Sequence, residues 1–68
     1  MTLVEVINAS HTPEMVIYEG YYGDKQLPIA ILKYGDGKIP IVCKQYGHRK
    51  VCIIQAACDE LQVWIEEE

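Results

Sequence analysis

The sequence predicts an all-β, mainly antiparallel domain: a small barrel-like or sandwiched sheet of five to six short strands. Three observations predict it, namely runs of β-branched residues, glycine-containing turn segments between them, and a central stretch that does not alternate apolar with polar residues. At 68 residues the chain has room for a single domain, residues 1–68. A domain of this size buries only about 60% of the surface that its unfolded chain exposes, so it usually needs a disulfide, a metal or a partner subunit.

The first half of the chain contains three predicted strands. Residues 2–7 are rich in β-branched side chains and carry one charge, which favours a strand over a helix. Residues 8–14 collect the small polar residues and the proline that are typical of turns. Residues 15–22 and 27–34 form the second and third predicted strands, with a turn at residues 23–26 between them.

A first hairpin is predicted at Gly35-Asp36-Gly37. This segment lies between the apolar residues 29–32 and 39–42, and its glycines can adopt the positive φ angles of a tight reversal. Pro28 and Pro40 cannot donate to a strand ladder, so we expect bends where the two strands begin.

A second hairpin is predicted at Gly47-His48. A two-residue loop there would place Cys43 opposite Cys52. The resulting ribbon, residues 39–56, is apolar on both faces and lacks the alternation of a strand pair that is wet on one side. We therefore expect it to be enclosed in a barrel, a sandwich or a subunit interface.

Residues 55–66 fit two structures. Leu61, Val63 and Ile65 alternate as in a strand. The spacing of a helix instead gathers Ile54, Ala57, Cys58, Leu61, Trp64 and Ile65 on one face. Three final glutamates would oppose the dipole at the C-terminus of a helix, so a strand is predicted, with a short C-terminal helix as the alternative.

Charge and apolar content predict a soluble, cytoplasmic protein. The formal net charge of -4 disfavours general nucleic-acid binding, which needs clustered lysine and arginine. No apolar run approaches the roughly 20 residues that cross a bilayer. The three cysteines are an odd number, and the chain shows no secretory leader, so we expect reduced thiols.

Metal binding and catalysis are both disfavoured. The spacing Cys43-x4-His48-x3-Cys52-x5-Cys58 supplies the ligand types of a zinc site, but it lacks a C-x2-C knuckle. Free cysteines are more often buried core residues, so no metal and no cofactor are predicted. No nucleophile elbow, His-Glu-x-x-His motif or phosphate loop occurs, and the chain is predicted not to be an enzyme.

The clearest candidate for binding is the segment 44–50, which combines three fixed cations, a histidine and a tyrosine at the predicted hairpin tip. Tyrosine suits surfaces that are half wet or in contact with a partner, and Tyr21 and Tyr22 are adjacent to a predicted turn. An ordinary solvated turn is the alternative interpretation. The candidate binding residues are Lys44, Tyr46, His48, Arg49, Lys50, Tyr21 and Tyr22.

These observations predict a small regulatory protein that self-associates as a homo-oligomer and binds, or inhibits, a protein partner. The alternative is a binder of a small phosphorylated or nucleotide-like ligand, in which tyrosines stack on the ligand and the basic segment 44–50 neutralises its phosphates. Single-stranded nucleic acid is disfavoured by the negative net charge.

Overall fold

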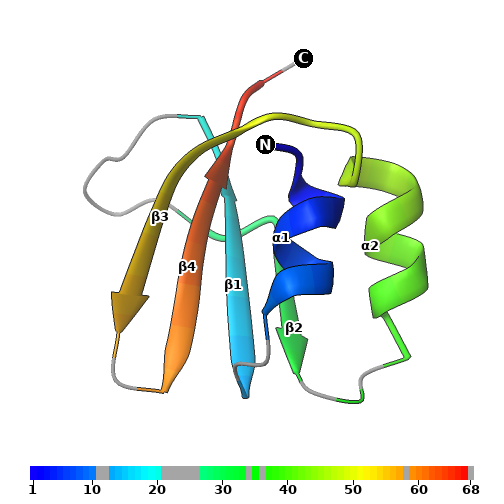
Figure 1. Ribbon diagram of the computed structural model, residues 1–68, viewed down its shortest axis with the longest axis vertical. Coiled ribbons are helices and arrows are strands. Elements are labelled where there is room, and N and C mark those ends of the chain that lie inside the picture. The colour runs from blue at the N-terminus through cyan, green and yellow to red at the C-terminus, as the bar shows by residue number, and fades with distance from the viewer. Residues whose placement is uncertain (11–12, 21–26, 34, 36, 58, 68) are drawn as a thin grey trace.

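Two helices and four strands follow one another along the chain (Figure 1). They are α1 (Leu3–Ala9), β1 (Glu14–Glu19), β2 (Ala30–Lys33), α2 (Ile39–Tyr46), β3 (Val51–Ala57) and β4 (Glu60–Ile65). The computed structural model describes residues 1–10, 13–20, 27–33, 35, 37–57 and 59–67. Across these residues the protein is a mixed α/β domain, so the prediction of an all-β barrel or sandwich with five to six strands is wrong.

The strands form one mixed sheet in the order β2-β1-β4-β3. The central strands β1 and β4 are parallel, with Ile17 opposite Val63 and Tyr18 opposite Trp64. The outer strands β2 and β3 each pair antiparallel with a central strand. The prediction of a mainly antiparallel sheet missed the parallel pair, which joins segments from the two ends of the chain.

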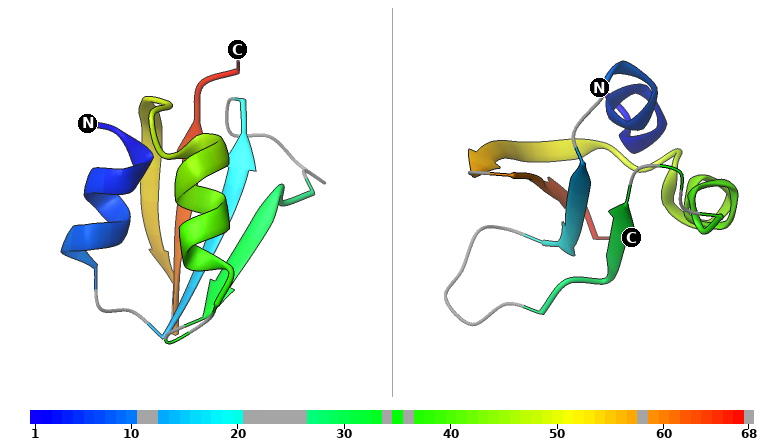
Figure 2. Two further views of the ribbon diagram at one scale, coloured as in Figure 1. Left: turned by 90° about the vertical axis from the view of Figure 1, so that its right-hand side faces the viewer. Right: turned by 90° about the horizontal axis from the view of Figure 1, so that it is seen from below.

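Both helices pack on the same face of the sheet, which gives the molecule two layers (Figure 2). α1 contributes Leu3 and Val6 to the core, and α2 contributes Val42. The sheet meets them with Met15, Ile17, Leu32, Val63 and Ile65. The core therefore lies between the helices and the central strands.

The other face of the central strands is also apolar. Val16 and Trp64 are 6% and 3% exposed, and they alternate with the core residues along their strands. The rings of Tyr18 and Trp64 stack across the parallel pair, with 4.7 Å between centroids and 14° between planes. Central strands that are buried on both sides contain uninterrupted apolar runs, as β1 does at residues 15–18 and β4 does at residues 63–65.

The segment predicted as a first strand is helix α1. Thr2 occupies the N-cap position, and both its N–H and its hydroxyl donate to Glu5 Oε1, at 2.9 and 3.0 Å. Leu3, Val6 and Ile7 recur at the three- and four-residue spacing of a helix and face the core. The β-branched composition favoured a strand, but capping and the burial of one helical face override it.

The segment predicted to follow a hairpin at Gly35-Asp36-Gly37 is helix α2, so both predicted hairpins are wrong. Pro40 is the second residue of α2, where the missing N–H costs no intrahelical hydrogen bond. Ile39, Val42 and Tyr46 face the core, and this spacing of three and four residues is helical. Gly47 is the C-cap of the same helix, so it is not part of a hairpin loop.

Three other predictions are confirmed. The strands predicted at residues 15–22 and 27–34 are β1 and β2, although both are shorter. The strand preferred for the last segment is β4, and β3 precedes it, so residues 55–66 contain no helix within the described part of the chain. The predicted turn at residues 23–26 lies outside the described residues.

Neither helix has the length and apolar character needed to cross a membrane, among the residues that the structure describes.

Candidate functional site

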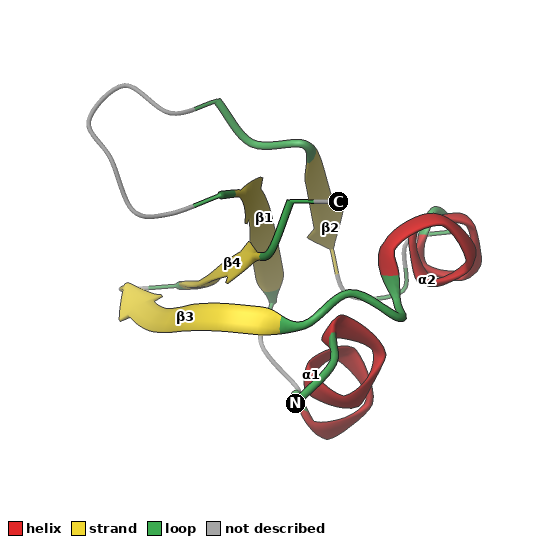
Figure 3. Cartoon of the chain, turned by 90° about the horizontal axis from the view of Figure 1, so that it is seen from above, coloured by secondary structure: helices red, strands yellow, loops and turns green. Residues whose placement is uncertain are grey.

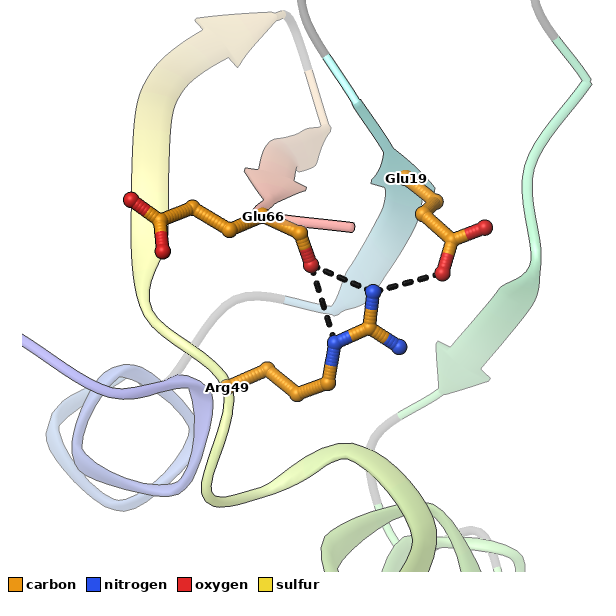
Figure 4. Close-up of polar contacts among 3 residues, drawn as sticks. All are labelled: Glu19, Arg49 and Glu66. Carbon is orange, nitrogen blue, oxygen red and sulfur yellow. Dashed lines mark hydrogen bonds and ion pairs between the residues drawn. The ribbon is translucent and has the colours of Figure 1, made fainter. Parts of the chain in front are cut away.

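Arg49 lies in the connection between α2 and β3. Among the described residues it is the one charged residue that is buried, with 7% of its surface exposed. Its Nε donates to the backbone oxygen of Glu66 at 2.9 Å, and its Nη2 donates to that oxygen as well (Figure 4). Nη2 also donates to Glu19 Oε2 at 2.5 Å. The guanidinium carbon lies 5.8 Å from the centre of the Tyr46 ring. One side chain thus joins the C-terminal ends of β1 and β4 to the end of α2.

The backbone around Arg49 is equally engaged. The oxygens of Arg49 and Gly47 accept hydrogen bonds from the N–H groups of Leu3 and Val4, at 2.9 and 3.0 Å. These donors belong to the first turn of α1, where a helix has no partners of its own. Arg49 was predicted as a ligand- or partner-binding residue, and the structure places it in contacts that hold the fold together.

The other predicted binding residues are spread over the molecule. Lys44 is exposed in the last turn of α2, and His48 and Lys50 are exposed in the connection that follows. Tyr46 is half-buried against the core. Because residues 39–46 are helical, these side chains do not share a hairpin tip. Tyr21 and Tyr22 lie outside the described residues.

Two shallow pockets lie at the end of the sheet where β1 and β4 finish. The larger has a volume of about 290 Å³, and its described lining residues are Gly20, Cys52, Glu66 and Glu67. The other, of about 200 Å³, is lined by His48, Arg49, Lys50, Glu66 and Glu67. Two glutamates line both pockets, and the guanidinium in the second already binds Glu19, so neither pocket is strongly cationic.

The cysteines of the described chain do not form the predicted cross-strand pair. Cys43 lies on α2 and Cys52 on β3, and both are free thiols of intermediate exposure. No group of three or more potential metal ligands occurs among the residues that the structure describes.

The outer edge of β3 is the remaining candidate. β3 is the last strand of the sheet and pairs with β4 alone among the four strands (Figure 3). Met1 and Thr2 cover its beginning, because Val51 N–H donates to Met1 O at 2.9 Å and Thr2 forms a bridge with Lys50. Beyond that point, the described chain contributes no strand to the outer side of β3.

The exposed side chains of this edge are uncharged. No charge occurs from Val51 to Ala57. Ile54 is 45% exposed, although it shares the helix-bearing face with its cross-strand neighbour Val63. Gln55 and Ala56 are also exposed. The helices lie toward the other end of the sheet and leave this part of the face uncovered (Figure 3).

The opposite edge strand of the sheet, β2, has the features that discourage pairing with a further strand. β2 is four residues long and ends in Lys33, whereas β3 has seven residues and no charge. Short length and lysine are the usual protection of an edge strand. The sequence contained a signal for the β3 edge, namely the absence of charge from 51 to 57, but the prediction assigned these residues to an enclosed ribbon.

Comparison with protein-family models, with curated proteins and with solved structures finds no match for this chain, so its function is argued from its own residues.

Proposed function

We propose that this chain is a small, non-catalytic interaction protein that binds a protein partner by strand addition at the outer edge of β3. In this mode an extended segment of the partner becomes a further strand of the sheet, and main-chain hydrogen bonds supply much of the affinity. The observation that carries the proposal is the uncharged, seven-residue edge strand with β4 on one side only.

The side chains along this edge suit such a partner. Ile54 offers an exposed apolar contact next to the ladder, and Gln55 on the other face offers an amide. Because the backbone groups of an edge strand are otherwise hydrated, adding a strand replaces water with a regular ladder. A partner bound in this way would have one of its own segments sequestered, and inhibition or regulation of that partner is the role we propose.

The alternative of a phosphorylated or nucleotide-like ligand has less support. Such a ligand needs several free cations around one pocket. Arg49 is engaged by Glu19 and by the Glu66 backbone, and Glu66 and Glu67, which carry carboxylates, line the smaller pocket together with His48 and Lys50. These carboxylates would repel a phosphate.

The proposal is tested by replacing Ile54 with lysine, which puts a charge on the edge. Wild type, Ile54→Lys and Ile41→Lys would each be tagged, produced in the natural host and used to capture bound proteins. Ile41 is the matched control, because it is an exposed isoleucine on α2, far from the edge, at 58% exposure. We expect proteins that bind wild type and Ile41→Lys to be lost from Ile54→Lys.

Recovery of the same proteins by all three variants would contradict the proposal, because binding would then not depend on the β3 edge. Circular dichroism of the three variants establishes that they are equally folded. Ile54 is exposed, so lysine there should leave the fold intact.

A further inference from the structure

We draw no further inference here: the strongest candidate, the outer edge of β3 beyond Val51, belongs to the site already described, and nothing in the described part of the chain shows what covers it.

Discussion

Arg49 and Glu19 form an ion pair, 2.5 Å between Nη2 and Oε2, that joins the connection before β3 to the end of β1. The Arg49 side chain is 6% exposed and the Glu19 side chain 38% exposed, so one partner is buried and the other reaches solvent. The same guanidinium binds the backbone oxygen of Glu66 beyond β4. Three segments that are distant in the sequence therefore depend on one side chain.

Replacing Arg49 should destabilise the fold. Arg49→Ala removes the donors to Glu19 and to the Glu66 oxygen, and we expect it to lower the free energy of unfolding by about 2–3 kcal/mol. Urea denaturation followed by circular dichroism measures this. Lys44→Ala is the control, because it removes an exposed cation from α2 and should change stability by less than about 0.5 kcal/mol. Equal stability of the two variants would show that the Arg49 contacts do not support the fold.

Gly47 should not tolerate a side chain. A Cβ atom at this buried residue would lie 2.4 Å from the Cys43 backbone oxygen, so the backbone would have to move. That backbone carries the hydrogen bonds from Gly47 N–H to Cys43 O and from Val4 N–H to Gly47 O. We expect Gly47→Ala to cost about 1–3 kcal/mol of unfolding free energy.

Gly37→Ala is the matched control for that substitution. A Cβ atom at Gly37 would have no heavy atom within 4 Å. Alanine there should leave stability unchanged or raise it slightly, because it restricts the unfolded chain. If both alanine variants unfold at the same urea concentration, the close approach at Gly47 has no energetic consequence.

Ile17 should be among the most sensitive core positions. It is fully buried, at 0% exposure, and lies on a central strand. Ile17→Ala leaves a cavity that the surrounding strands cannot close, and we expect it to lower the free energy of unfolding by about 2–5 kcal/mol. Ile31→Ala, at a position on β2 that is 43% exposed, should cost much less in the same denaturation experiment. If Ile17→Ala and Ile31→Ala lower the free energy of unfolding equally, Ile17 does not lie in the core.

The cap of α1 should make stability depend on acid pH. Hydrogen bonds from the Thr2 N–H and hydroxyl lower the pKa of Glu5 below its ordinary value of 4.5. A carboxylate whose folded pKa is lowered stabilises the fold above the unfolded pKa, and this contribution is lost as pH falls through the folded pKa. We expect stability to fall more steeply below pH 4.5 for wild type than for Glu5→Gln.

Urea denaturation of both proteins at a series of pH values from neutral to acid measures that difference. Parallel curves would mean that the Thr2–Glu5 hydrogen bonds do not persist in solution.

Local patterns predicted three of the strands well. β1 and β4 each have three β-branched or aromatic residues among their six, and such residues prefer a pleated, half-buried surface. The same preference failed for residues 2–7 and 39–46. In both segments apolar residues also recur at helical spacing, and Thr2 with Glu5 or Pro40 supplies a helix start. Intrinsic preferences are small, so burial of a helical face outweighs them.

The candidate site was harder to predict, because an edge is a property of strand order. The residues of β3 were recognised as apolar on both sides. No local sequence pattern indicates that β4 is their neighbour or that no described strand lies beyond them. Similarly, the charge of Arg49 predicted a binding residue. Its burial follows from the approach of Glu19 and Glu66, which lie 30 and 17 residues away in the sequence.

By itself the sequence determined the length of the chain, the negative net charge, the strand character of β1, β2 and β4, and the absence of charge along β3. The tertiary structure alone decided that β1 pairs in parallel with β4, that two helices cover one face, and that β3 is left at the edge. The reason is that local preferences act over a few residues, whereas strand order is set by which apolar faces can be buried together over the whole chain.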